Sequence, residues 1–209
     1  MQKENVRVRQ LDSEELAHYA KDTYEIEYLF PMGWSELEGI ANRTDFDLRR
    51  HAEFSGRELE YFDEESGEHI VPYVIEPSAG VDRLFMAFLM DAYDEEEVRG
   101  ETRVIMRLHK DLAPIKVAVL PLSRHEKLVP PAKEVSAIVR KQWMSQYDDA
   151  QSIGRRYRRQ DEVGTPLCVT IDFDTLEDQA VTIRERDSME QVRVPIAGLV
   201  DALRERLED

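Results

Sequence analysis

One stretch, Val71–Arg83, decides the fold of the N-terminal half, and it reads VPYVIEPSAGVDR. The run Ile70–Glu76 is rich in valine, tyrosine and isoleucine, which is typical of a β-strand. Gly80 closes the turn that follows, and the apolar run Val81–Tyr93 predicts a buried helix. The stretch therefore predicts a strand that ends at Glu76, a tight turn and a helix.

Upstream of this stretch the sequence predicts two helices and two strands. Ser13 can cap a helix, and Glu14 and Glu15 suit its positive end. Two apolar runs read as strands on either side of the turn Pro31–Gly33. The predicted elements are a helix over Ser13–Thr23, strands over Tyr24–Phe30 and Trp34–Ala41, and a helix over Asp45–Phe54.

An acidic seam separates the two halves of the chain. It runs from Asp91 to about Lys116 and contains four successive acidic residues, Asp94–Glu97, before Pro114. A solvated acidic run followed by proline indicates a linker. We therefore expect one domain over residues 1–110 and a second over 111–209.

The second half predicts a three-layer α/β domain. Lys116–Leu122 (KVAVLPL) is a continuous apolar run, which suits a strand buried on both faces. Strands then alternate with helices, as they do around a mixed sheet. The further strands are Leu167–Phe173, Ala180–Glu185 and Gln191–Val194, and the helices are Pro131–Ser145, Ser152–Gln160 and Ile196–Leu207.

Composition narrows the class of protein. The net charge of −16 opposes non-specific binding to nucleic acid. That charge is concentrated in residues 1–110, with 13 basic and 26 acidic residues against 15 and 18 in the remainder. Cys168 is the single cysteine, so the chain forms no internal disulfide and no cysteine-based zinc site. The N-terminus lacks a signal-peptide pattern, and we expect a cytoplasmic protein.

Four stretches together resemble the homodimer-type glycyl-tRNA synthetase, a class II enzyme. They are Gly33–Leu48 (GWSELEGIANRTDFDL), Val71–Arg83, Ser152–Pro166 (SIGRRYRRQDEVGTP) and Asp172–Asp178 (DFDTLED). The resemblance implies an α+β protein: the C-terminal part of an antiparallel-sheet catalytic domain, with motif 3, followed by an α/β anticodon-binding domain with a mixed sheet. It also implies ATP-dependent activation of glycine, transfer of glycyl to tRNA(Gly), a magnesium ion with the ATP, and a homodimer.

In that family a glycine site matches Glu76, Pro77, Ser78, Ala79 and Gly80. A bound glycine offers an ammonium and a carboxylate, and Glu76 can face the ammonium through a charge-assisted hydrogen bond. Ser78 can add a hydrogen bond, while Pro77 and Ala79 can form small, rigid walls. Taken alone, Glu76 reads equally as an ordinary carboxylate at a strand end.

The resemblance assigns ATP contacts to two segments. They are the pair Glu36 and Leu37, with Glu36 helping to hold magnesium, and the motif 3 run Gly80, Val81, Asp82 and Arg83. Arg83 is the expected catalytic residue, which presents a guanidinium to the γ-phosphate. The competing interpretation pairs Arg83 with Asp82 or a nearby glutamate. We expect Glu76 and Arg83 to share one cavity, and we read Arg43, Asp45 and Asp47 as a structural ion network.

The basic cluster Arg155–Arg159 is the candidate tRNA contact. Arg155, Arg156, Arg158 and Arg159 can meet phosphates, and Tyr157 can stack on an unpaired base. A solvated basic helix balanced by Asp161 and Glu162 explains the same pattern.

Class II motifs 1 and 2 are not found in the chain, so we expect it to be nearly inactive by itself and to bind tRNA weakly. The alternative is a non-catalytic tRNA- or nucleic-acid-binding protein on the same scaffold, similar to the synthetase-related accessory subunit of mitochondrial DNA polymerase.

Overall fold

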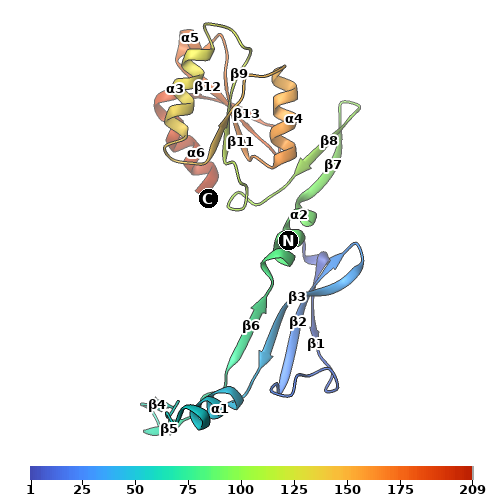
Figure 1. The fold of residues 1–209 in the computed structure, drawn as a ribbon. Coiled ribbons are helices and arrows are strands. Elements are labelled where there is room, and N and C mark those ends of the chain that lie inside the picture. The colour runs from blue at the N-terminus through green and yellow to red at the C-terminus, as the bar shows by residue number, and fades with distance from the viewer. Residues whose placement is uncertain (209) are drawn as a thin grey trace. The chain divides into compact units, whose positions relative to one another are not determined.

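The computed structural model describes residues 1–208, which form two compact units, Met1–Asp91 and Ala92–Asp209. Each unit has its own sheet and its own core (Figure 1). The predicted domain boundary after residue 110 stays a prediction, and residues 92–110 belong to the second of these units. No helix among the described residues has the length and apolarity to cross a bilayer.

The first unit is built on a four-stranded antiparallel sheet with the order β1-β2-β3-β6. Its strands are β1 (Val6–Gln10), β2 (Asp22–Phe30), β3 (Gly33–Asn42) and β6 (Ile75–Ala79), and a short 3₁₀ turn, η1 (Lys3–Asn5), precedes them. Both strands predicted around Pro31–Gly33 are confirmed. Gly33 has φ 105°, which a side chain would resist, and it turns the chain tightly from β2 into β3.

The helix predicted over Ser13–Thr23 is wrong. This segment is a series of turns that joins β1 to β2, and Leu11 N–H donates to Thr23 C=O to extend the pairing of those strands. Arg9 in β1 binds Glu15 at 2.6 Å. Glu15 therefore stabilises the connection between β1 and β2 and does not lie at a helix N-terminus. The pairing of these strands overrides the local capping pattern.

The stretch Val71–Arg83 forms the predicted strand, turn and helix, but the strand begins and ends further along the chain than predicted. The run Ile70–Glu76 divides into the end of β5 (Glu68–Ile70), four irregular residues, and the start of β6. The other elements of this unit are α1 (Phe46–Ser55), β4 (Tyr61–Asp63) and α2 (Val81–Ala92). α2 covers one face of the sheet, where Ala87 packs with Tyr28, Phe30 and Leu37.

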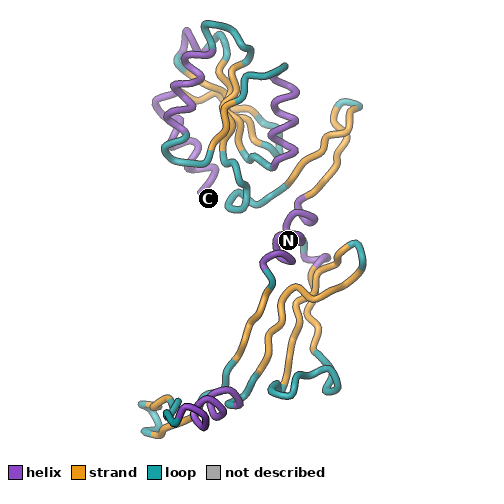
Figure 2. The backbone as a smooth tube through the Cα atoms, in the orientation of Figure 1, coloured by secondary structure: helices purple, strands orange, loops and turns teal. Residues whose placement is uncertain are grey.

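The second unit is a mixed five-stranded sheet between helices, as predicted (Figures 1 and 2). The order is β10-β9-β11-β12-β13, with the first three strands parallel and the last two antiparallel to their neighbours. These strands are β9 (Val117–Pro121), β10 (Ser145–Tyr147), β11 (Leu167–Ile171), β12 (Ala180–Glu185) and β13 (Gln191–Pro195). The helices are α3 (Val129–Val139), α4 (Ile153–Val163), α5 (Thr175–Asp178), η2 (Ile196–Gly198) and α6 (Leu199–Glu208).

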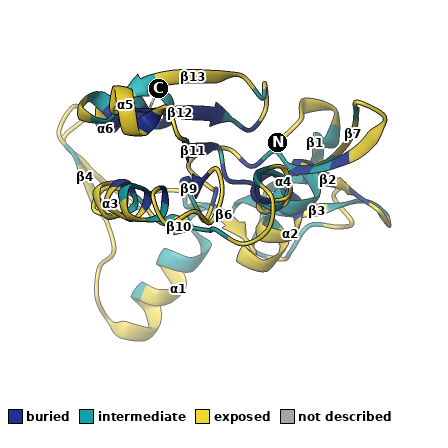
Figure 3. Ribbon diagram, turned by 90° about the horizontal axis from the view of Figure 1, so that it is seen from above, coloured by how far each residue is buried: buried dark blue, intermediate teal, exposed yellow. Residues whose placement is uncertain are grey.

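Alternate side chains of β9 enter two separate cores. Val117 and Val119 join the larger core with α3 and α6, where Leu199, Leu203 and Leu207 are buried. Ala118 and Leu120 face α4, together with Cys168. β9 and β11 are buried along their whole length (Figure 3), which is why KVAVLPL carries no polar alternation.

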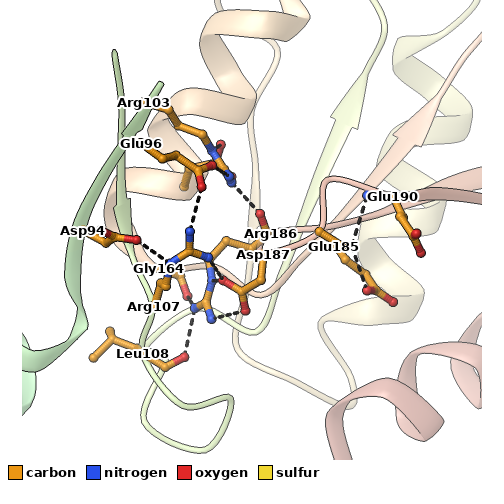
Figure 4. A network of polar contacts seen from close by, with 12 residues as sticks. Asp94, Glu96, Arg103, Arg107, Leu108, Gly164, Glu185, Arg186, Asp187 and Glu190 are labelled. Atoms are coloured by element: carbon orange, nitrogen blue, oxygen red, sulfur yellow. Dashed lines mark hydrogen bonds and ion pairs between the residues drawn. The ribbon is translucent and has the colours of Figure 1, made fainter. Parts of the chain in front are cut away.

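Two predictions for this unit need correction. The helix predicted over Pro131–Ser145 ends at Val139, and Ser145 instead begins β10 beside β9. The predicted linker is a hairpin, β7 (Tyr93–Val98) and β8 (Glu101–Met106), that packs against α4. Its acidic residues are ligands for arginines, since Glu96 binds Arg103 and Arg107 (Figure 4).

A buried ion network fastens this hairpin to the rest of the second unit. Arg103 is fully buried and donates from Nε to Asp161 of α4 at 2.9 Å, and also to the Arg186 carbonyl. Arg184 of β12 donates hydrogen bonds to both carboxylate oxygens of Asp161, at 2.9 and 3.1 Å. Arg186 donates to the Leu108 and Gly164 carbonyls, both at 2.9 Å. One carboxylate thus joins hairpin, helix and sheet.

Candidate functional site

Glu76, the predicted ammonium ligand, lies in β6 and is paired with an arginine. Arg43 Nη1 lies 2.6 Å from Glu76 Oε2, and the Glu76 side chain keeps 43% of its exposure. Arg43 follows β3 directly, and Ala41 of β3 pairs with Glu76. The prediction of a buried strand end is wrong, since β6 is the last strand in its sheet and Glu76 lies near its beginning.

The five residues of the predicted glycine site divide between two faces. Successive side chains of a strand point to opposite faces. Glu76 and Ser78 therefore share one face of β6, while Pro77 and Ala79 point to the other. The prediction that Pro77 and Ala79 wall the same pocket as Glu76 is wrong for their side chains. Gly80 follows the strand and is exposed.

Arg43 is the residue that the sequence interpretation undervalued. Its guanidinium also binds Asp47 and lies 3.8 Å from the centre of the Tyr19 ring. The hydrogen bond from Arg43 holds the pKa of Asp47 below its ordinary value. Asp45, which was predicted to share a structural ion network with Arg43 and Asp47, pairs with Arg49 on α1 instead. The missing signal was the pairing of β3 with β6, which brings Arg43 to Glu76.

Glu36 belongs to the same sheet face as Glu76. Glu36 pairs with Glu27 of β2, and Ala41, the partner of Glu76, pairs with Thr23. Thr23, Glu25 and Glu27 alternate onto one face. A Cβ added at Gly39 would lie 3.2 Å from Glu36 Oε1, so the bare glycine gives this carboxylate room.

Charge on this face is crowded. Burial raises the pKa of Glu25, and the neighbouring charge of Glu36 raises it further. Arg7 offsets Glu27, and Arg9 approaches Glu25 at 3.4 Å. Three carboxylates on this face thus have only two neighbouring arginines. A bound cation would reduce the repulsion among the carboxylates.

These carboxylates suit a magnesium ion that arrives with phosphate. Across residues 1–208, no three His, Cys, Asp or Glu side chains are grouped to hold a metal by themselves. Magnesium is commonly held by one or two carboxylates together with substrate phosphates. The assignment of Glu36 to magnesium stays a prediction.

Leu37 occupies a β-bulge and points into the core. The pairing of β2 with β3 skips Leu37, since Ile26 faces Glu38 and Glu27 faces Glu36. Its side chain is 5% exposed and packs in the cluster under α2. The Leu37 side chain is therefore not available to a ligand, and the predicted ATP contact of the pair Glu36 and Leu37 stays a prediction.

Arg83 begins α2 as predicted, together with the exposed residues Gly80, Val81 and Asp82. Its Nη2 lies 2.7 Å from Ser35 Oγ, and its guanidinium lies 5.6 Å from the Phe30 ring centre. The alternative, an ion pair of Arg83 with Asp82 or a nearby glutamate, is not found among residues 1–208, where the Arg83 side chain donates to Ser35.

The structure does not bring Arg83 to Glu76. Ser35, which binds Arg83, and Ala41, which pairs with Glu76, are six residues apart on β3, or about 20 Å at ~3.3 Å per residue. Ser35 also pairs with Tyr28, on the face covered by α2. The prediction that both side chains enter one small cavity is wrong for this arrangement, in which each lies at its own end of the strand.

The basic cluster of α4 is only partly available to RNA. Arg156 is fully buried and donates to the carbonyls of Pro121, Asp148 and Leu122. Burial lowers the pKa of Arg156. The predicted contact of Arg156 with tRNA is wrong, because its guanidinium joins β9 to the loop after β10.

The other members of the cluster differ in their freedom. Arg159 is engaged by Asp148 and by Gln151 at 3.0 Å. Tyr157 is half-buried, and its hydroxyl is 2.6 Å from Thr170 Oγ1. Arg155 is exposed and Arg158 is half-buried. The predicted RNA contacts of these four stay predictions, with Arg155 the freest.

A cavity of about 470 Å³ lies at the carboxyl ends of β9 and β11. Leu122, Asp172 and Phe173 follow these two strands and line it together with Tyr157 of α4. Phe173 is exposed and stacks edge-on with His125. An open aromatic beside carboxylates can stack on a base and accept hydrogen bonds from its amino group.

Comparison with known proteins accounts for both units. Residues 116–206 match the family described as "Anticodon binding domain". A glycine–tRNA ligase of Caldanaerobacter subterraneus is 56% identical over 208 residues, which are 100% of this chain and 45% of that protein. The Thermobifida fusca glycine–tRNA ligase is 56% identical over 98% of this chain and 46% of that protein. The chain spans about 45% of the length of these relatives.

The fold is also found in a solved structure. The crystal structure of prolyl-tRNA synthetase from Cryptosporidium parvum complexed with L-proline and AMP matches with a TM-score of 0.68 and 19% identity. The match covers 97% of this chain and 42% of that one. At this identity the likeness supports the α+β architecture.

Proposed function

The chain is related over its whole length to the glycine–tRNA ligases and carries an anticodon-binding domain, and from this premise we propose that it takes part in the ATP-dependent joining of glycine to tRNA(Gly). The observation that carries the proposal is the Glu76–Arg43 pair on the open face of the first sheet, within a chain 56% identical to such ligases.

The pair offers both charges that glycine needs. A free glycine has an ammonium and a carboxylate two bonds apart, and it has no side chain to bind. Glu76 accepts from the ammonium, and the Arg43 guanidinium donates to the carboxylate through charge-assisted hydrogen bonds. Ser78 lies on the same face and adds a hydroxyl. Glycine then takes the place of part of the direct contact between Glu76 and Arg43.

The proposed chemistry has two steps. An oxygen of the glycine carboxylate attacks the α-phosphorus of ATP, and the bond to pyrophosphate breaks. A ribose hydroxyl at the tRNA 3′ end then attacks the glycyl carbonyl carbon, and AMP leaves. The contribution of this chain is to hold the carboxylate for attack and to steady phosphate charge.

Arg83 and Glu36 are the proposed contacts for ATP. The exposed Arg83 guanidinium can leave Ser35 for a phosphate, since a hydrogen bond between exposed groups costs little to exchange for one with a phosphate. Magnesium, held by Glu36 and the phosphates, would neutralise the leaving pyrophosphate. We further propose a homodimer in the cytoplasm, as the sequence resemblance implies.

The test is glycine-dependent exchange of pyrophosphate into ATP by the complete protein that carries this chain. We expect exchange that requires glycine and is abolished by Glu76→Ala, with the melting temperature preserved. Glu53→Ala is the matched control, because Glu53 lies on α1 and pairs only with Arg50 among the described residues. Exchange unaffected by Glu76→Ala would remove Glu76 from the site, and tRNA binding without any exchange would favour the non-catalytic alternative.

A further inference from the structure

The hairpin β7–β8 and helix α4 enclose a second cavity of about 530 Å³ within the second unit. Arg99 and Glu101 line it from the hairpin, Arg155 and Arg158 from α4, and Arg184 from β12. Arg99 lies outside residues 116–206, the part that matches the anticodon-binding family. The segment expected to be a linker thus contributes a wall to this cavity.

The lining of this cavity is cationic in an acidic protein. Four of its residues are arginines and one is a glutamate, whereas the whole chain has a net charge of −16. Arg99 and Arg155 are exposed, and within residues 1–208 neither has a hydrogen bond or ion pair from its side chain. A negatively charged ligand is therefore favoured here above most of the surface.

Arg158 is also short of a counter-charge. Its Nη1 lies 3.8 Å from Asp161, a carboxylate that already accepts from Arg103 and Arg184. Asp161 thus faces three guanidiniums, of which Arg103 also pairs with Glu96. The remaining positive charge lies on the cavity side, where Arg184 is itself a lining residue.

The arginine at the hairpin tip is held firmly in place. Arg99 and Gly100 form the two-residue turn between paired Val98 and Glu101, with φ values of 55° and 81°. Such turns fix the direction of both strands. Four residues further on, Arg103 is locked to Asp161, so the tip cannot leave α4 without breaking a buried ion pair.

We propose that this cavity binds phosphodiester groups of an RNA backbone, with Arg99, Arg155 and Arg158 as the ligands. Guanidiniums match the paired oxygens of a phosphate and stay charged at all relevant pH values. The inference rests on the proposed binding of tRNA and adds to it a phosphate-binding arm, the hairpin. Tyr157 and Gln191 line both this cavity and the cavity beside Phe173. An RNA chain whose phosphates are bound by the arginines can therefore continue into the cavity beside Phe173.

The experiment measures binding of tRNA(Gly) to the full chain by fluorescence anisotropy across a range of salt concentrations. Each phosphate contact contributes about 0.7–0.9 to the slope of log affinity against log salt. The triple variant R99Q/R155Q/R158Q should lower that slope by about 2 and weaken binding by at least about tenfold at 0.15 M salt. R99Q alone should lower the slope by about 1, and its exposed, unpaired side chain makes it safe for folding.

R204Q is the matched control, because Arg204 is a partly exposed arginine of α6 that pairs with Asp201 and Glu208. It should bind as the unmodified chain does. Unchanged slopes for R99Q and for a folded triple variant would overturn the phosphate site while leaving tRNA binding intact. Absence of RNA binding by the unmodified chain would overturn the anticodon function as well. Displacement of RNA by inorganic pyrophosphate at equal phosphate concentration would show a site for free anions and overturn the RNA assignment.

Discussion

The Arg43 guanidinium lies 2.6 Å from the Glu76 carboxylate, across the pairing of β3 with β6. The contact joins two residues 33 positions apart in the chain. The two side chains carry opposite charges, so Glu76 can meet the ammonium of a zwitterion and Arg43, which also binds Asp47, can meet its carboxylate. Arg43 is therefore as central to the proposed glycine site as Glu76.

Replacing Arg43 by glutamine should raise the KM for glycine about 10- to 100-fold, because a charge-assisted hydrogen bond contributes ~1.5–3 kcal/mol. The KM for ATP should change far less. Pyrophosphate exchange by the complete protein measures both constants. Arg50→Gln, which removes an exposed α1 arginine paired with Glu53, should change neither. Equal losses for glycine and ATP in Arg43→Gln would mean that Arg43 only supports the sheet.

Replacing Arg83 by alanine should weaken the use of ATP far more than the binding of glycine. Arg83 lies about 20 Å along β3 from the partner of Glu76, so it is too far to contact glycine. Ser35→Ala is the matched control, since it removes the partner of Arg83 but keeps the guanidinium. It should preserve ATP use. An equal effect of Arg83→Ala on both substrates would make Arg83 structural.

The second unit followed closely from the sequence because its signals are local and strong. The apolar run of β9 and the leucines at 199, 203 and 207 each mark a buried face without reference to any partner. The hairpin β7–β8 was missed because its acidic residues resemble a solvated linker, whereas the arginine partners of Glu96 lie 7 and 11 residues further along the chain and reach it only once the hairpin forms. In the first unit, Ser13 and Glu15 carry a capping pattern that strand pairing overrides.

The sequence could predict only part of the candidate site for the same reason. Glu76, Ser78 and Arg83 stand in one short motif, so a sequence pattern finds them. Arg43 depends on strand register, and Arg156 depends on burial against the ends of β9 and β10. Residue spacing alone predicts neither the register of two strands nor the burial of a charged side chain.

Replacing Asp161 by asparagine should destabilise the second unit by about 3–5 kcal/mol, because it leaves the buried Arg184 guanidinium without a counter-charge and leaves Arg103 with Glu96 alone. Arg103 and Arg184 both lose their ion pair with it. Thermal unfolding should shift down by at least about 10 °C. Asp201→Asn, at an exposed carboxylate that pairs with Arg204, should shift it by less than about 2 °C. A small shift for Asp161→Asn would mean that the hairpin is held by other contacts.

Cys168 should resist thiol reagents in the folded chain. Its side chain is buried between the sheet and α4, and burial raises the pKa of the thiol to about 12. Only the thiolate reacts, so labelling at pH 8 should be slow until denaturant is added. Absorbance after addition of a disulfide reagent, with and without denaturant, measures this. Rapid labelling of the folded chain would show that α4 opens readily from the sheet.

Acid should destabilise the second unit through the carboxylates held by Arg193. Burial raises the pKa of Asp172, but hydrogen bonds from Arg193 and Thr175 outweigh it and hold the value below its ordinary level. The hydrogen bond from Arg193 also lowers the pKa of Asp178. A carboxylate with a lowered folded-state pKa stabilises the fold above its unfolded pKa of about 3.9, and that stability is lost as the pH falls through the folded value.

Melting temperatures measured from pH 6 to pH 2 should therefore fall below about pH 4. The melting temperature of Arg193→Gln should fall less steeply, because both carboxylates then lack the largest of the contributions that lower their pKa. Arg204→Gln leaves Asp172 and Asp178 untouched and should follow the unmodified chain. If Arg193→Gln instead tracked the unmodified chain over the whole range, Arg193 would contribute nothing to the acid response, and the linkage would lie with other carboxylates such as Asp148, whose pKa is also lowered.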